Sequence, residues 1–282
     1  MEKSDNFLHS SGNLNVSQIM TKIDEAYSTT ENESAKKVLN DLVEPNYTMA
    51  PVKVDGLIKK FVRKRDLKES GNISDYSVEI NKNQLISYDT ELINLIDYFS
   101  FCLESDPFYF ILRGNSIVGF VLPADFNKQP ARTLFYILFS KLEIDLKHTF
   151  QKCFENDDEW LRLLSASEKE KISCQYKELQ KHDLEISKLE CAQMKNILDA
   201  MREDEFLLNK IGGCSKNQFK SIAEDIRHFR DLTMHPINKL IDSAEEFNRL
   251  IKTKNSVLQL LKNINKYLFM ENVPASNPDS PT

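Results

Sequence analysis

Residues 215–238, SKNQFKSIAEDIRHFRDLTMHPIN, have the pattern of one capped helix. Ser215 is followed three residues later by Gln218, the capping-box spacing in which each side chain accepts a hydrogen bond from a backbone amide at the helix start. Side chains then recur at helical spacing along one face, namely Phe219, Ile222, Ala223 and Ile226, with Thr233 continuing the stripe. The sequence therefore predicts a helix that packs through this face.

Two residues with useful chemistry lie near the end of this helix. Arg230 falls on the packed stripe, where a guanidinium needs a partner, a groove or an interface because an unpaired buried charge is very costly. Pro236 follows His235 and should end the helix, so His235 is expected at a rigid corner. In an ideal helix Arg230 and His235 point about 140° apart. They share a site only if the corner is distorted or a second chain contributes.

The segment FRDLTMHP has the form Arg-x4-His and resembles the motif of HEPN domains, in which Arg, a polar residue and a later His close the third helix. The resemblance covers about residues 131–268 and implies an antiparallel helical bundle. It implies a catalytic set of Arg230, Asp231 and His235, with His228 and Glu143 as accessory candidates. A structural salt bridge of Arg230 and a helix-capping role of His235 form the alternative interpretation.

The chemistry that this motif implies is RNA cleavage without a metal or other cofactor. RNA carries its own nucleophile, the 2′-hydroxyl, and imidazole, which titrates near pH 6.5, serves as base or acid while a guanidinium holds the phosphate. HEPN ribonucleases dimerise so that two motifs face one cleft, and the resemblance implies a homodimer here. The rival hypothesis is a non-catalytic RNA-binding, protein-binding or dimerisation protein. A role in a toxin or defence system is left open.

Residues 84–126 change to the order strand, helix, strand, strand, and two of the strands are joined by the tight turn RGNS. The ending GNSIVGFVLPADF resembles a CBS module, and Gly119 and Asp125 match that pattern. Leu122 stands where modules that bind adenine nucleotides usually carry Thr or Ser, so only weak nucleotide binding is expected; Asp125 capping the next turn is the alternative. CBS modules work in pairs. The second half is expected either before residue 80 or in another chain.

These patterns divide the chain into four parts. They are a mobile arm (1–45), a CBS-like module with a preceding basic helix (46–128), a HEPN-like helical domain (131–270) and a disordered tail (271–282). The basic helix is predicted at residues 54–67, where Leu57, Ile58, Phe61 and Val62 share one helical face. The expected fold class is therefore mainly α, with a small α+β module of βαββ order followed by a helical bundle.

Composition excludes several classes of protein. A net charge of −6 argues against a surface that coats nucleic acid throughout, although a local groove is compatible with it. Five cysteines, with no Cys-x2-Cys spacing, indicate reduced thiols and predict no metal site. No apolar run reaches the roughly 20 residues of a membrane span, and the polar start MEKSDNFLHSSGN is unlike a signal peptide. A cytoplasmic protein that does not enter membranes is expected.

Overall fold

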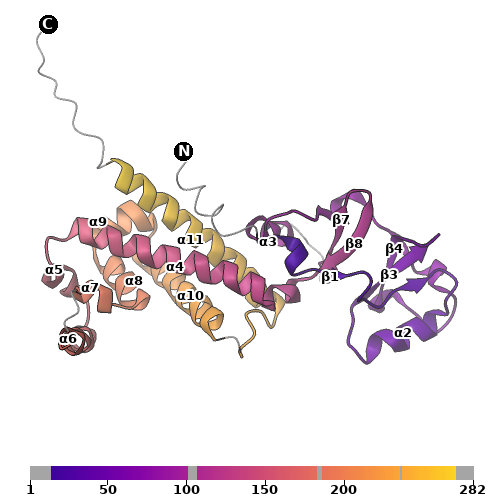
Figure 1. The fold of residues 1–282 in the computed structure, drawn as a ribbon, viewed down its shortest axis with the longest axis horizontal. Coiled ribbons are helices and arrows are strands. Elements are labelled where there is room, and N and C mark those ends of the chain that lie inside the picture. Colours follow the sequence, from indigo (N-terminus) through magenta and orange to yellow (C-terminus); the bar gives the residue numbers. More distant parts are fainter. Residues whose placement is uncertain (1–13, 101–106, 183–185, 236, 271–282) are drawn as a thin grey trace, which may run out of the picture. The chain divides into compact units, whose positions relative to one another are not determined.

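The computed structural model describes residues 14–100, 107–182, 186–235 and 237–270. These residues form two compact units (Figure 1). Unit 2 contains the described residues up to 134 together with 241–244, and unit 1 contains residues from 135 to 240 and from 245 onward. The predicted tail and the first 13 residues of the predicted arm lie outside the described residues.

Unit 2 contains the βαββ succession twice, in two sheets of the same order. The first half consists of β2 (Thr29–Thr30), α2 (Ala35–Val43), β3 (Met49–Val54) and β4 (Leu57–Arg63), and the second of β6 (Leu85–Ser87), α3 (Leu92–Ser100), β7 (Tyr109–Arg113) and β8 (Ser116–Val121). In each half the first strand is parallel to the second, which is antiparallel to the third. Short edge strands complete the sheets, β5 (Val78–Glu79) beside β4 and β1 (Thr21–Lys22) beside β8. The second half confirms the predicted βαββ order, and its partner half lies before residue 80.

The predicted basic helix at residues 54–67 is wrong, because most of this stretch is strand β4. Asp55 and Gly56 form the two-residue turn between β3 and β4, with φ of 52° and 78°. An Asp-Gly pair between strand-forming residues is a strong hairpin signal, and it prevails over the helical spacing that follows. Lys59 pairs with Asp55 at 3.0 Å and Lys60 with Glu31 at 2.8 Å, so part of the basic charge is compensated locally.

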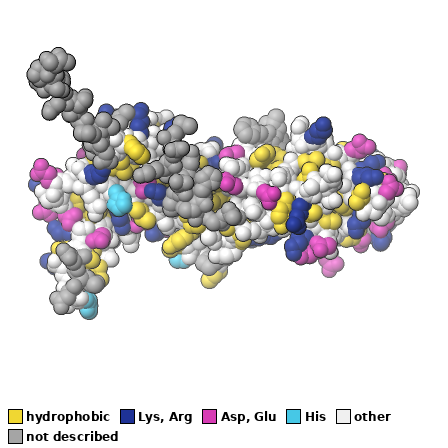
Figure 2. All heavy atoms as spheres, turned by 45° about the horizontal axis from the view of Figure 1, so that its top comes forward, with side chains coloured by type: hydrophobic (Ala, Val, Ile, Leu, Met, Phe, Trp, Pro, Cys, Tyr) yellow, Lys and Arg dark blue, Asp and Glu magenta, His cyan; other side chains and the backbone are white. Residues whose placement is uncertain are grey.

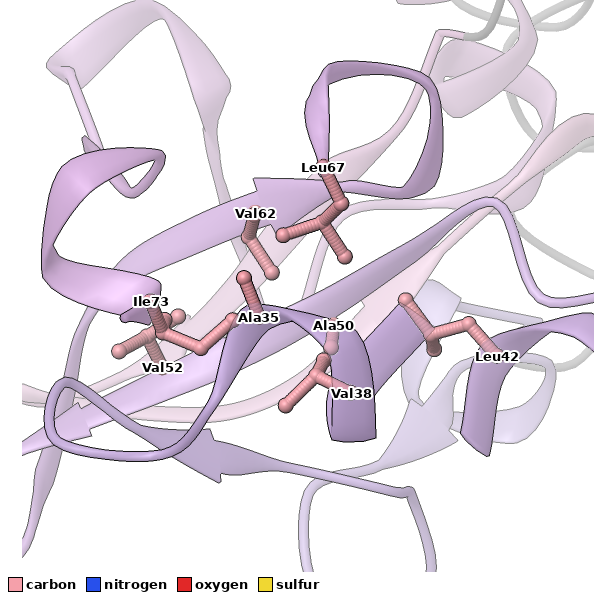
Figure 3. Close-up of a cluster of buried hydrophobic side chains, with 8 residues drawn as sticks. All are labelled: Ala35, Val38, Leu42, Ala50, Val52, Val62, Leu67 and Ile73. Atoms are coloured by element: carbon pink, nitrogen blue, oxygen red, sulfur yellow. The ribbon is translucent and has the colours of Figure 1, made fainter. Parts of the chain in front are cut away.

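Residues 14–45 fold into unit 2, so the predicted mobile arm is wrong for this part of the chain. Helix α2 packs on β3 and β4 through a buried cluster (Figure 3), made of Ala35, Val38, Leu42, Ala50, Val52, Val62, Leu67 and Ile73. Only three residues of this nine-residue helix belong to the buried cluster. Such a short pattern is hard to recognise in the sequence, and strand β2 beside it has only two residues.

The two halves of unit 2 pack through a second, aromatic cluster, made of Met49, Phe61, Phe108, Phe110 and Phe120. Phe61 in β4 meets two rings of the second half, with centroids 5.0 Å from Phe108 and 6.0 Å from Phe110. The neighbouring Val62 belongs to the cluster under α2. Side-chain alternation along β4 therefore places α2 on one face of the first sheet and the second half on the other.

The described part of unit 1 is helical. Its helices are α4 (Gln129–Cys153, from residue 135), α5 (Asp157–Leu161), α6 (Ala166–Gln180), α7 (Lys188–Cys191), α8 (Met194–Glu203), α9 (Glu205–Leu207), α10 (Lys216–Met234) and α11 (Ala244–Met270), with a π-helical turn at Leu208–Gly212. Helix content and the small mixed sheets agree with the expected mainly α fold class.

Helix α10 confirms the prediction from residues 215–238 at its start and along its face. The Ser215 amide donates to Gln218 Oε1 at 3.1 Å, and the Gln218 amide donates to Ser215 Oγ at 3.3 Å. Phe219, Ala223, Ile226 and Thr233 are buried as expected, whereas Ile222 is only partly buried. The spacing extends to Phe229, which is fully buried. This face fixes α10 in the bundle and thereby sets the direction of its last turn.

Candidate functional site

A groove of about 330 Å³ lies between α4 and α10 in unit 1, and we call it the α4/α10 groove. The residues that matter for its chemistry are Tyr136, Glu143, Ile144 and Lys147 from α4 and Arg230 and Met234 from α10. Tyr136, Ile144 and Met234 are about half exposed. The groove therefore combines charged groups with a partly apolar lining that is open to solvent.

Arg230 finds the partner that its position on the packed stripe requires. One guanidinium nitrogen, Nη2, lies 3.6 Å from Glu143 Oε2, and Nη1 lies 3.4 Å from Asp231 Oδ1. Glu143 is the accessory residue expected from the HEPN resemblance, and the structure brings it to Arg230. Its second oxygen, Oε1, lies 3.2 Å from Lys147 Nζ. A single carboxylate thus bridges two cations, and Lys147 was not anticipated.

His235 stands at the end of α10 and does not line the groove. Its backbone leaves the helix with φ −112° and ψ 86°, while its amide still donates to Asp231 O at 3.1 Å. The imidazole is exposed, and Pro236, which was expected to shape the corner, lies outside the described residues. Within one chain, the structure therefore gathers Arg230, Asp231 and Glu143 but leaves His235 apart from the groove.

His228 points to a different helix. Its Nε2 lies 3.0 Å from Glu246 Oε1 in α11, and its ring meets Phe229 edge-on at 4.9 Å between centroids. The contact with Glu246 ties α10 to α11, as does the ion pair of Arg249 with Asp225 at 2.6 Å. The groove is lined without His228. The structure thus gives this accessory candidate a structural partner.

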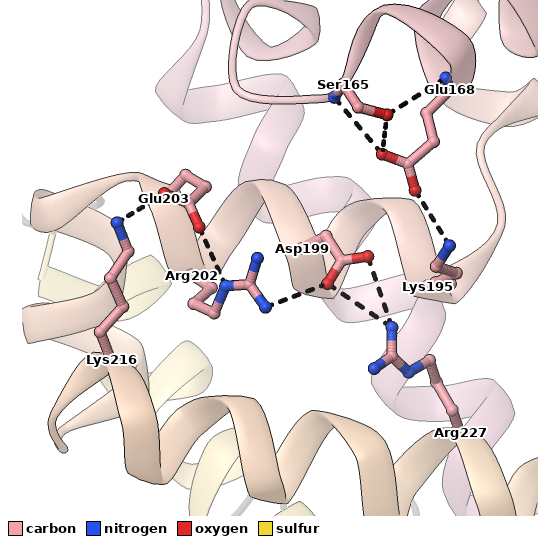
Figure 4. Close-up of polar contacts among 8 residues, drawn as sticks. All are labelled: Ser165, Glu168, Lys195, Asp199, Arg202, Glu203, Lys216 and Arg227. Carbon is pink, nitrogen blue, oxygen red and sulfur yellow. Dashed lines mark hydrogen bonds and ion pairs between the residues drawn. The ribbon is translucent and has the colours of Figure 1, made fainter.

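A ladder of ion pairs holds α10 against α8 and α8 against the start of α6 (Figure 4). Asp199 in α8 lies 3.4 Å from Arg227 and 3.7 Å from Arg202, and Lys216 at the start of α10 reaches Glu203. Glu168, which caps α6 together with Ser165, pairs with Lys195 at 3.1 Å. The ladder fixes α10, the helix that carries Arg230, against α8.

In unit 2 the structure gives Asp125 the capping role that was the alternative to nucleotide binding. Its Oδ2 accepts a hydrogen bond from the Leu122 amide at 2.7 Å, and its Oδ1 lies 2.7 Å from Lys128 Nζ. The carboxylate thereby closes the short 3-10 helix Pro123–Asn127. Burial raises the pKa of Asp125, and the Lys128 ammonium and the Leu122 amide oppose that rise.

The raised pKa of Asp125 predicts a specific pH dependence of stability. Its carboxyl binds a proton more tightly in the folded chain than in the unfolded chain, where the ordinary value is 3.8. Protonation therefore adds to the free energy of unfolding as pH falls through the raised pKa, and this gain is complete below the ordinary value. Asp125→Asn lacks the effect. The melting temperature of the native chain minus that of Asp125→Asn should therefore increase as the pH is lowered from about 7 to about 4. A difference that stays constant or decreases as the pH is lowered contradicts the prediction.

Gly119, the other nucleotide-binding candidate, serves strand packing. Strand β1 pairs with β8 at this position, and a Cβ atom on Gly119 would lie 2.7 Å from Met20 Sδ and 2.8 Å from the backbone oxygen of Thr21. A backbone oxygen cannot yield as a flexible side chain does. The glycine is thus explained by the close approach of β1 and not by a ligand.

Gly119→Ala should displace β1 and destabilise unit 2 by about 1–3 kcal/mol, the usual cost of overpacking. The Ile23 amide, which donates to Val118 O at 3.0 Å, should then exchange its hydrogen faster. Ser116→Ala on the same strand is the matched control, because Ser116 is exposed. Unchanged exchange at Ile23 in the Gly119 variant would show that β1 does not depend on this contact.

An internal repeat links the two halves of unit 2 and was not recognised in the sequence. Phe61-Val62 followed by Asp66 matches Phe120-Val121 followed by Asp125, at the end of the third strand of each half. The two aspartates differ in surroundings, since the side chain of Asp66 is half exposed and lies 3.9 Å from Arg65. The repeated Phe-Val-x3-Asp pattern was the signal that could have located the first half.

Comparison with known proteins assigns no family to this chain. No family model matches the sequence, and no curated protein matches it either. The solved structures with some likeness include CBS-domain proteins. A hemolysin-like protein containing a CBS domain from Oenococcus oeni PSU has 14% identity and a TM-score of 0.35, over 43% of this chain and 93% of its own.

Two further structures show the same degree of likeness. The CBS domains of a transcriptional regulator from Streptococcus pneumoniae have 16% identity and a TM-score of 0.33, over 38% of this chain and 92% of theirs. The CBS domain of the bacterial CNNM/CorC family Mg²⁺ transporter, in complex with ATP, has 14% identity and a TM-score of 0.35, over 47% and 96%. These identities and TM-scores are too low to assign a fold. The paired βαββ order of unit 2 is established by its own strands and their pairing.

Three further features concern surface charge, membrane-spanning helices and metal-binding groups. On the face drawn in Figure 2, the Lys and Arg side chains of the described residues are interspersed with Asp and Glu side chains. Among the described helices, none has the length and apolar character needed to cross a membrane. The described residues also hold no group of three or more His, Cys, Asp or Glu placed to bind a metal ion.

Proposed function

We propose that this chain is a two-part protein in which a CBS-like unit 2 senses a small ligand and unit 1 cleaves RNA as a homodimer, without a metal. The observation that carries the proposal is the end of α10. Arg230 reaches an open groove with a third of its side chain exposed, and His235 presents an exposed imidazole five residues later. The form Arg-x4-His with its polar Asp231 fits the HEPN type of ribonuclease.

The proposed reaction uses only groups that these residues supply. The 2′-oxygen of RNA attacks the adjacent phosphorus while an imidazole accepts the 2′-hydroxyl proton, and the bond between phosphorus and the 5′-oxygen breaks. A second acid protonates that oxygen, which leaves a 2′,3′-cyclic phosphate. Arg230 would hold the non-bridging phosphate oxygens as their charge grows. One exposed imidazole per corner cannot act as base and acid at once, so the proposal includes a second copy of the chain, whose His235 takes the other role.

Incubation of the purified full-length chain with mixed single-stranded RNA in EDTA tests this proposal. The expected result is fragments that end in 2′,3′-cyclic phosphate, formed by a species with twice the mass of one chain in light scattering. Intact RNA, or cleavage that appears only when a divalent metal is added, contradicts it. RNA fragments with linear 3′-phosphates from the first time point would point to a different reaction.

A second candidate function is binding without catalysis, through the α4/α10 groove. Two observations favour it: Arg230 already has two carboxylate partners, and three apolar side chains stand half exposed around it, Tyr136, Ile144 and Met234. Such a surface suits a protein partner or a second copy. The two candidates separate in the EDTA experiment, because this one predicts a complex and no RNA fragments.

The ligand of unit 2 is proposed not to be an adenine nucleotide bound through Asp125. Both carboxylate oxygens of Asp125 have partners, and Leu122 offers no hydroxyl to a phosphate. A ligand between the halves would have to use other groups. The paired βαββ arrangement supports the sensing role, which is part of the proposal.

A further inference from the structure

We infer that Lys147 and Arg230 form a phosphate-binding site in the α4/α10 groove, and that Glu143 occupies this site as an internal substitute for the phosphate. The inference rests on the proposed function, since it names how that site takes an anionic substrate. It adds a binding residue, Lys147, and a gating residue, Glu143.

The geometry around Glu143 is that of a bound anion. Its two oxygens each face one cation, Oε1 at 3.2 Å from Lys147 Nζ and Oε2 at 3.6 Å from Arg230 Nη2. Lys147 comes from α4 one turn after Glu143, and Arg230 comes from α10, so the cations flank the carboxylate from two helices. A phosphate group has the same charge sign and presents oxygens in the same way.

The contacts of Arg230 are loose enough to be exchanged. Charge-assisted hydrogen bonds between a guanidinium and a carboxylate are usually 2.7–2.9 Å long. Those of Arg230 are 3.6 Å to Glu143 and 3.4 Å to Asp231, and neither is a bidentate pair. A phosphate that accepts two parallel N–H bonds from the planar guanidinium fits it better than either carboxylate does.

Partial burial strengthens the electrostatic interactions of these three side chains. The side chains of Glu143 and Lys147 are each 22% exposed and that of Arg230 is 33% exposed, so water screens them less than it screens surface pairs. The groove of about 330 Å³ has room for a phosphate group beside them. Together with Asp231, the other carboxylate partner of Arg230, these groups carry no net charge while Glu143 is charged and a net charge of +1 without the Glu143 charge. Glu143 therefore competes directly with the substrate for both cations.

The test measures binding of a short fluorescein-labelled oligouridine to the full-length chain by fluorescence anisotropy in EDTA. The 2′-hydroxyls of this probe are methylated, so that the proposed cleavage reaction cannot consume it. Glu143→Gln keeps the shape and removes the charge, and it should tighten binding about tenfold, as for one charge-assisted hydrogen bond. The slope of log affinity against log salt should steepen by about 0.7 for one added phosphate contact. Lys147→Gln should weaken binding about tenfold and cancel the gain in the double variant.

Glu224→Gln is the matched control, because Glu224 is exposed on α10 and lies outside the groove lining. It changes the net charge equally and should leave affinity within about twofold. Equal gains in the two Gln variants, no gain in Glu143→Gln, or no RNA binding by any variant would each overturn the inference. The binding measurement can succeed when the cleavage experiment fails. Tighter binding by Glu143→Gln, together with intact RNA in the cleavage experiment, would refute the ribonuclease proposal but support the phosphate-binding site.

Discussion

His235→Ala should lower the rate of RNA cleavage in EDTA by at least about a hundredfold. General acid–base catalysis by one side chain contributes roughly 10²–10⁴ in rate, and in the proposed homodimer both imidazoles are lost together. The side chain is exposed at the end of α10, so its removal should leave melting and dimer mass unchanged. Cleavage is measured from initial rates on a defined single-stranded RNA.

The control for this prediction is His182→Ala. His182 is an exposed histidine just beyond α6 and has no place in the proposed site. It should cleave at the native rate. Full activity in His235→Ala, or an equal loss in His182→Ala, would exclude His235 as the base or acid. Arg230→Lys adds a graded comparison, because it keeps a positive charge but loses the planar fork that holds a phosphate.

Phe61→Ala should destabilise unit 2 by about 3–5 kcal/mol, the range for deleting a buried phenylalanine. The ring is 2% exposed, and its centroid lies 5.0 Å from that of Phe108 and 6.0 Å from that of Phe110. Alanine would leave a cavity where the two halves meet. The edge-on ring contacts would also be lost.

Hydrogen exchange resolves this effect better than a global melting curve, since a chain of two units need not unfold in one step. Amides of β3, β4 and β7 should exchange roughly 10²- to 10⁴-fold faster, and those of α10 should keep their protection. Leu57→Ala is the control, because Leu57 begins the same strand but is 58% exposed. A similar loss of hydrogen-exchange protection in the two variants would show that the aromatic cluster does not determine the stability of unit 2.

The elements that could be predicted from the sequence are those with long or sharply bounded patterns. Helix α10 combines a capping box with five turns of periodic side chains, and the β7–β8 hairpin has apolar strands on both sides of a Gly-Asn turn. Strands β1, β2 and β5 have two residues each, which is too short for any periodicity. Their pairing is decided by tertiary contacts. The region before residue 80 was one of the two places expected for the first half, but its strands were not predicted and β4 was predicted to be a helix.

The candidate site was accessible to sequence reasoning only in part. Glu143 was expected near Arg230 from the resemblance, and the two side chains do meet. Lys147 was missed, although its spacing of four residues from Glu143 on one helix is a recognisable ion-pair pattern. His235 does not line the groove, which agrees with the angle of about 140° between Arg230 and His235 in an ideal helix.

The pairing of β1 with β8 has a consequence for how the chain acquires its fold during synthesis. Thr21 lies opposite Phe120 and Lys22 opposite Gly119, so the two strands of this pair are about a hundred residues apart. At 5–20 residues per second a ribosome needs roughly 5–20 s to make the residues between them. The first half, whose strands are close in sequence, can form during that interval, whereas β1 must wait for β8 to emerge. The second sheet is therefore completed by the first strand of the described residues, and only after β8 has been made.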